Sequence, residues 1–136
     1  MSEPKKRVCI ISFSFIYLDS RVLRQIEYLY PHYELTVIGY GEPHPDWADK
    51  VDWHSVWRGS EFARGVVIVF WLILGRLWRG FYDYRFWAKL PAKQALRHAI
   101  ASDADVIHAN DWNTLPIAIR AAEHTGAKVI FDVHEY

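Results

Sequence analysis

The sequence predicts an α/β fold with a parallel sheet between two layers of helices. Short apolar runs rich in β-branched residues alternate along the chain with longer segments whose apolar residues recur at helical spacing. The short runs are mostly apolar throughout, as is usual for strands buried on both faces. Strands that alternate with helices are joined by right-handed crossovers and therefore run parallel. The expected architecture is a Rossmann-like three-layer sandwich formed by one domain over residues 1–136.

The first half of the chain is expected to hold three strands and one helix. The helix covers residues 21–30, where apolar residues recur at helical spacing. Asp19 or Ser20 can cap its first turn, and Pro31 ends it. The strands are the apolar or alternating runs at residues 8–15, 33–41 and 51–57.

The second half is expected to be richer in helix. Residues 60–90 are typical of one or two helices, and residues 91–102 continue as helix. A later helix has Pro116 in its first turn and Gly126 as its stop signal. The remaining elements are a buried strand at residues 103–111, that later helix at 113–126 and a last strand at 127–133.

Composition excludes several classes of protein. Sixteen basic residues balance sixteen acidic ones, so the basic excess typical of nucleic-acid-binding proteins is missing. The single cysteine, Cys9, excludes an intrachain disulfide and a cysteine-rich metal site, and its apolar neighbours predict that it is buried. The basic start has no small-residue cleavage site before the charged residues 19–21, so we expect a cytoplasmic protein.

The turn after the first strand argues against a dinucleotide site. Binding a pyrophosphate at this turn normally requires Gly-x-Gly-x-x-Gly, which lets the phosphates approach the backbone at a helix N-terminus. Residues 12–21 read SFSFIYLDSR and contain no glycine. A Walker-type phosphate loop is also missing. A nicotinamide- or flavin-dependent oxidoreductase and a sugar-nucleotide epimerase are therefore disfavoured, and no cofactor is expected.

Polar residues follow several of the expected strands. In a parallel α/β sheet, ligands bind outside the carboxyl ends of the strands, where successive strand–helix connections meet. This rule predicts a binding site formed by residues 14–21, 39–42, 108–114 and 134–136.

Three motifs in this order resemble a known family. An Asp-x-Arg-Val stretch opens the first helix, a His-x-Asn-Asp-Trp-x-Thr stretch ends a middle strand, and a His-Glu pair follows the last strand. Together they resemble the amino-terminal domain of GT-B glycosyltransferases, most closely the retaining family 4 or "group 1" enzymes. The similarity covers nearly the whole chain apart from residues 42–101. The matching residues are Asp19 and Arg21, then His108, Asn110, Asp111, Trp112 and Thr114, then His134 and Glu135.

The resemblance implies glycosyl transfer from a nucleotide sugar with retention of configuration and without a metal ion. The acceptor, a surface glycan or a lipid-linked saccharide, would lie mainly against this domain. The donor would lie mainly against a second Rossmann-like domain that carries paired glutamates, and this chain is expected to lack that domain. The domain itself would continue with a further strand and helix. The expectation is therefore an incomplete amino-terminal half that is inactive alone.

The resemblance also assigns roles near the end of the last strand. It implies that His134 contacts the donor sugar and helps to position the acceptor. A neutral imidazole can donate a hydrogen bond to a sugar hydroxyl, and a charged one can offset phosphate charge. Glu135 could accept hydrogen bonds from the sugar or the acceptor. The alternative for both is an exposed position near a chain end with no role.

The other candidates each have a structural alternative. Asp111 could bind acceptor hydroxyls, or cap the helix that begins near residue 113. Trp112 could form an apolar wall for a sugar ring, or pack at the start of that helix. Arg21 could bind a phosphate of the donor or acceptor, or be a surface residue. Asp19 is expected to cap the first helix or to pair with Arg21, and His108 to be a core or near-core histidine.

Residues 62–87 are unusually aromatic. Their uninterrupted apolar run, residues 66–74, is far shorter than the ~20 residues of a membrane span. Flanking arginines and tryptophans are typical of a helix that lies in the headgroup layer of a membrane. The alternatives are a buried helix, or a packing interface with a partner chain, the missing domain or a second copy. A non-catalytic module that binds a membrane surface or a protein partner through this segment is the rival function. The predicted interface, at the inner face of the cytoplasmic membrane, consists of Arg64, Trp71, Arg76, Trp78, Arg79 and Phe81.

Overall fold

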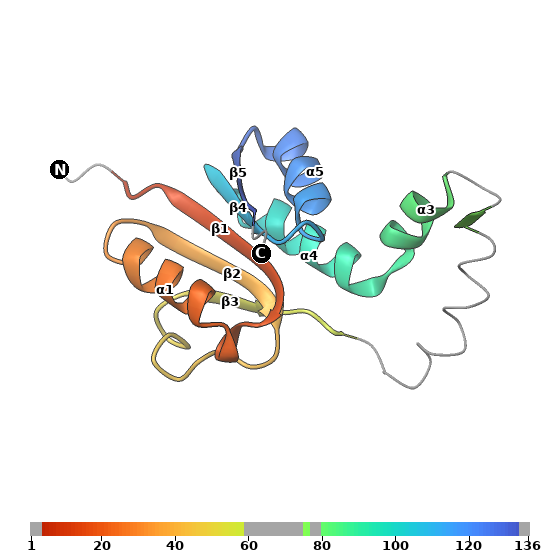
Figure 1. Cartoon of the computed structure of the whole chain (residues 1–136). Coiled ribbons are helices and arrows are strands. Elements are labelled where there is room, and N and C mark those ends of the chain that lie inside the picture. The colour runs from red at the N-terminus through yellow and green to blue at the C-terminus, as the bar shows by residue number, and fades with distance from the viewer. Residues whose placement is uncertain (1–3, 59–74, 77–79, 134–136) are drawn as a thin grey trace.

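The computed structural model describes residues 4–58, 75–76 and 80–133 (Figure 1). The strands in this part of the chain form one sheet in which every neighbouring pair is parallel, in the order β3-β2-β1-β4-β5. The α/β class and the parallel sheet are as predicted. The strands are β1 (Arg7–Phe15), β2 (Glu34–Tyr40), β3 (Asp52–Ser55), β4 (Val106–Asn110) and β5 (Lys128–Asp132).

Helices cover both faces of the sheet, which completes the three layers (Figure 1). On one face, α1 (Ser20–Leu29) follows β1 through a short 3-10 turn, η1 (Ile16–Leu18). On the other face lie α4 (Leu90–Ala101) and α5 (Leu115–Thr125). The predicted helical stretch at 60–90 contains α3 (Phe81–Ala88), which lies farther from the sheet (Figure 1). Most of the stretch before α3 is outside the described residues.

Each face of the sheet has its own core because successive side chains of a strand point to opposite faces. Val8 and Ile10 of β1 pack with Val22 and Ile26 of α1. Cys9 and its alternate neighbours on β1 face the other way, where small alanines of α4 and α5 let the helices approach the sheet closely. Cys9 is fully buried as predicted, and this burial raises the pKa of its thiol to about 12.

The helix ends follow the signals in the sequence in two cases. Asp19 is the N-cap of α1, where its carboxylate accepts a hydrogen bond from the backbone N–H of Arg21. Gly126 ends α5 with a φ of 76°, a left-handed conformation that glycine adopts without a steric penalty.

Candidate functional site

The carboxyl ends of β1, β4 and β5 lie side by side, and we call this end of the sheet its carboxyl edge. The connection from β1 to α1, the connection from β4 to α5 and the end of β5 all meet there (Figure 1). This is the edge at which parallel α/β proteins bind ligands. Most of the polar residues that the sequence singled out belong to it.

A side chain fills the turn where a dinucleotide-binding protein has its glycines. Ile16 of η1 is fully buried and packs against Gly39 on β2. A Cβ atom at position 39 would clash with the Ile16 side chain and lie 2.9 Å from the carbonyl oxygen of Ser12. Glycine is therefore required on β2 so that the apolar turn can close over the sheet. The turn presents an isoleucine where a pyrophosphate would need open backbone.

Asp19 and Arg21 form a two-point ion pair at the start of α1. The Arg21 Nε donates to one Asp19 oxygen at 3.2 Å, and a terminal guanidinium nitrogen donates to the other at 3.1 Å. Partial burial alone would raise the pKa of Asp19, but hydrogen bonds from Arg21 and Ser14 and the Arg21 charge lower it overall. Asp19 thus both caps the helix and pairs with Arg21, and it holds the guanidinium at the edge of the sheet.

A polar network of three side chains ties α1 to β4 and β5. The amides of Gln25 and Asn110 exchange two hydrogen bonds, of 2.9 Å and 3.0 Å, and Gln25 Nε2 also donates to the Asp132 carboxylate at 3.3 Å. Asn110 is only 1% exposed. Sequence reasoning missed Gln25 and Asp132. A signal for Gln25 existed, since it follows Arg21 by four residues and precedes Tyr28 by three, which places all three on one face of the helix.

The connection from β4 to α5 corrects one prediction. One of the two roles predicted for Asp111 was to cap a helix beginning near residue 113, but α5 begins at Leu115 and Thr114 occupies the cap position. Asp111 has a φ of 71°, a left-handed conformation that delays the helix. The buried Thr114 hydroxyl donates to the carbonyl oxygens of Asn110 and Asp111 at 2.6 Å and 2.9 Å, which stabilises this turn.

Trp112 is the most exposed ring at this edge. It is 76% exposed, so the predicted alternative of packing at the helix start does not apply to it. It lies between Asp111 and Asn113 in sequence and presents an apolar surface next to polar groups. His134 and Glu135 lie outside the described residues, and β5 ends at Asp132 at this same edge. Their predicted roles stay predictions.

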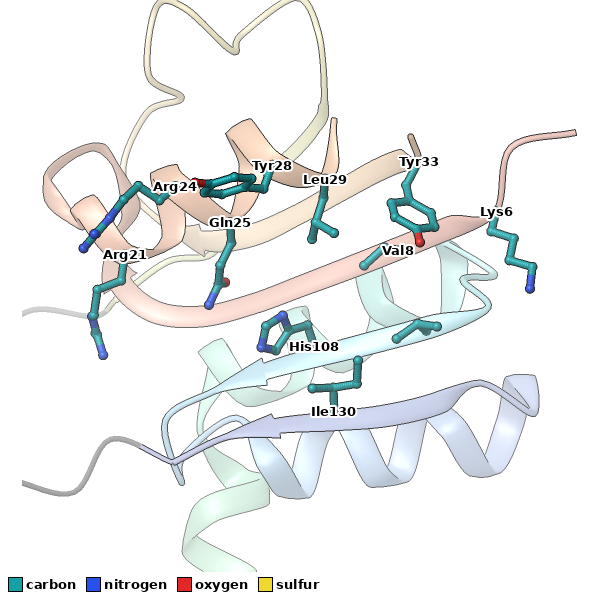
Figure 2. Close-up of a pocket in the computed structure, with 11 residues that line it drawn as sticks. Lys6, Val8, Arg21, Arg24, Gln25, Tyr28, Leu29, Tyr33, His108 and Ile130 are labelled. Atoms are coloured by element: carbon teal, nitrogen blue, oxygen red, sulfur yellow. The ribbon is translucent and has the colours of Figure 1, made fainter. Parts of the chain in front are cut away.

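A groove of about 650 Å³ begins at Arg21 and runs along α1 over the sheet. Figure 2 shows Arg21 and Arg24 at one end, Lys6 at the other, and the His108 and Ile130 side chains projecting toward α1 from β4 and β5. His108 is half-buried, as expected for a near-core histidine. The other residues that line the groove are Val8, Gln25, Tyr28, Leu29, Tyr33 and Val106.

The aromatic segment is described only in part. Arg76 is exposed, whereas Phe81 is 4% exposed and so does not present its ring at the surface. Tyr84 on α3 is exposed. Arg64, Trp71, Trp78 and Arg79 lie outside the described residues. In the part of the chain that the structure describes, no helix has the length and apolar character needed to cross a bilayer.

Two further observations bear on the type of site. Among residues 4–58, 75–76 and 80–133, no three His, Cys, Asp or Glu side chains are grouped so that they could hold a metal ion. The sequence matches no protein-family model and none of the curated proteins.

Proposed function

We propose that this chain is the acceptor-side domain of a two-domain glycosyltransferase. The enzyme transfers a sugar from a nucleotide-sugar donor to a glycan or lipid-linked acceptor with retention of configuration, in the cytoplasm or at the inner face of the cytoplasmic membrane. One observation carries the proposal: Asp19, Arg21, Asp111, Trp112 and the end of β5 gather at the carboxyl edge of a parallel sheet whose first turn leaves no room for a dinucleotide.

The chemistry at this edge suits a carbohydrate. An exposed indole can stack on the apolar face of a sugar ring, and the neighbouring Asp111 carboxylate can accept hydrogen bonds from its hydroxyls. Arg21 holds a positive charge at the same edge, where a phosphate of the donor or of a lipid-linked acceptor would be stabilised. These groups would bind and orient the substrate. In glycosyl transfer, positive charge develops at the reacting sugar carbon, and fixed orientation and oriented polar groups supply most of the rate acceleration.

His134 is the proposed contact to the donor sugar. One residue, Val133, separates it from Asp132, the last residue of β5 and a member of the polar network with Gln25. The reading frame that encodes this chain gives a first check. The proposal requires that the frame encode a second domain with paired glutamates, Glu-x7-Glu.

The decisive test is turnover by the protein from the full reading frame. We expect His134→Ala to lower kcat at least ~100-fold, as for removal of a group that acts on developing charge. Trp112→Ala should raise KM for the acceptor and change KM for the donor little. Trp57→Ala, at another exposed tryptophan on the chain, is the matched control and should change neither constant. Unchanged turnover in both test variants would overturn the proposal.

A second candidate function is a non-catalytic module that binds a membrane surface or a protein partner through residues 62–87. The exposure of Arg76 and Tyr84 favours it, because a basic and an amphipathic aromatic side chain are typical of the membrane interface. Flotation with liposomes containing anionic lipid tests it. Binding that disappears in Arg76→Glu would support this function, and no flotation at low salt would exclude the membrane.

A further inference from the structure

Beside α1, one face of the sheet is not covered by any helix among the described residues. Ile130 of β5 points to this face and is 52% exposed, whereas its neighbours Val129 and Phe131 pack against the core under α4 and α5. His108 pairs with Ile130 in the register of β4 and β5 and faces the same way (Figure 2). Parallel sheets are normally covered by helices on both faces. Among the described helices, α1 is the one on this side, and it packs over β1 and β2.

The open face has the shape of a helix-sized groove. Its one side wall is α1, whose ten residues correspond to a length of ~15 Å. Its floor is formed by Val8, Val106 and Ile130 from three adjacent strands. Leu29 and Tyr33 point into it from above (Figure 2). A second helix laid beside α1 would bury this apolar surface and satisfy its own backbone groups internally.

Basic side chains lie at both ends of the groove, although Arg21 is paired with Asp19. Arg21 and Arg24 lie at one end and Lys6 at the other, and no carboxylate is among the lining residues. Lys128 pairs with Val106 and is exposed on the same face of the sheet. The nearest carboxylates to the arginine end, Asp19 and Asp132, accept hydrogen bonds from Arg21 and Gln25. An occupant with negative charge at both ends complements this pattern.

We propose that the groove binds an amphipathic helix of a partner protein, about three turns long, with an apolar stripe flanked at both ends by acidic residues. The apolar stripe covers Val106 and Ile130, and the acids face Lys6 at one end and Arg24 at the other. A second copy of this chain fits less well. A symmetric contact would set two basic grooves against each other, and like charges in an interface are repulsive.

Two synthetic peptides test the charge pattern. Both are helical, about 14 residues long, and share one leucine stripe, but one has Glu at both ends and the other has Lys. Binding is measured by fluorescence anisotropy with the labelled peptide, and the site is located by NMR shifts of the Val8, Val106 and Ile130 methyl groups. We expect the Glu peptide to bind at least ~10-fold more tightly than the Lys peptide at low salt, with the difference reduced at high salt.

Variants of the protein locate the site. Ile130→Asp should weaken binding of the Glu peptide at least ~10-fold, because it places a charge in the apolar centre of the contact. Ile119→Asp, at an equally exposed isoleucine on α5 across the sheet, is the matched control and should have no effect. Arg24→Glu should weaken the Glu peptide and strengthen the Lys peptide. Circular dichroism confirms that each variant is folded.

Three results would overturn the proposal. The first is equal affinity for the two peptides, or no binding of either to the protein from the full reading frame, whose further residues would then occupy the groove. The second is loss of binding in Ile119→Asp as large as in Ile130→Asp, which would place the peptide elsewhere. The third is a dimer of this chain in sedimentation experiments that Ile130→Asp converts to a monomer, which would assign the groove to a second copy.

Discussion

The amide pair of Gln25 and Asn110 gives a quantitative prediction about what holds the candidate site together. The two side chains exchange two hydrogen bonds between α1 and β4. Asn110 is buried, whereas Gln25 is partly exposed and can turn to water. Replacing either residue by alanine removes these two bonds, and Gln25→Ala also removes the longer bond to Asp132. The two replacements differ in which partner is left behind.

The magnitudes follow from this difference in burial. A hydrogen bond contributes about 0.5–1.5 kcal/mol to stability, so Asn110→Ala should cost about 1–3 kcal/mol through its two bonds. Gln25→Ala removes the same bonds and also leaves the buried Asn110 amide without a partner, which costs a further ~1–3 kcal/mol. The double variant has no stranded amide, and the sum of the single effects counts the two bonds twice. It should therefore be more stable than that sum implies, by at least ~2 kcal/mol.

Urea unfolding followed by circular dichroism measures these values, provided that the m-values of the variants agree. Glu27→Ala, at an exposed position of α1 outside the network, is the control and should change the free energy of unfolding by less than ~0.5 kcal/mol. The reasoning is refuted if the two single effects add to within ~0.5 kcal/mol, or if Gln25→Ala is milder than Asn110→Ala.

Three further predictions concern the rest of the domain. Gly39→Ala should lower the free energy of unfolding by about 1–3 kcal/mol, because the added methyl group collides with the Ile16 side chain; a neutral result in thermal or urea unfolding would show that the turn after β1 can shift. Cys9 should resist iodoacetamide at pH 8 in the folded protein and react in urea, because burial raises the pKa of its thiol to about 12; equal rates by mass spectrometry would contradict this. Burial, His54 and Arg97 lower the pKa of His98, whose ring stacks on His54 with centroids 4.2 Å apart. The unfolded chain then takes up a proton near pH 6.5 that the folded one resists, so stability is full above pH 6.5 and falls below it; His98→Gln should flatten that slope in pH-dependent unfolding.

The strands β1 and β2 were predictable because most of their residues are buried on both faces and therefore form continuous apolar runs. Residues 8–15 and 33–41 in the prediction correspond to β1 and β2 with small shifts at their ends. The alternation of strands and helices predicts that the strands are parallel, but it does not predict their full order in the sheet. The position of β1 between β2 and β4 depends on which apolar faces pack together, and that information is distributed over the whole chain.

The candidate site was predictable in position and less so in detail. The rule for parallel sheets located the edge, and Asp19 was correctly identified as a cap or an Arg21 partner. The cap expected at Asp111 was wrong because its left-handed conformation postpones the start of α5, and nothing in a run of Asn-Asp-Trp-Asn fixes that turn. The Gln25–Asn110 pair joins residues that are far apart in sequence, and a pairing of that kind leaves no local pattern.

The order of the strands also has a consequence for synthesis on the ribosome. β1 lies in the middle of the sheet, yet one of its edges pairs with β4, which follows β3 by roughly 50 residues of chain. At ~5–20 residues per second, that edge waits several seconds for its partner while β2 and β3 are already present. During this time the N–H and C=O groups on that edge of β1 are unpaired, and β1 is the most apolar strand of the domain. A strand of another nascent chain could pair with them. A chaperone that shields residues 7–15 until β4 emerges is therefore expected to improve the yield of folded protein.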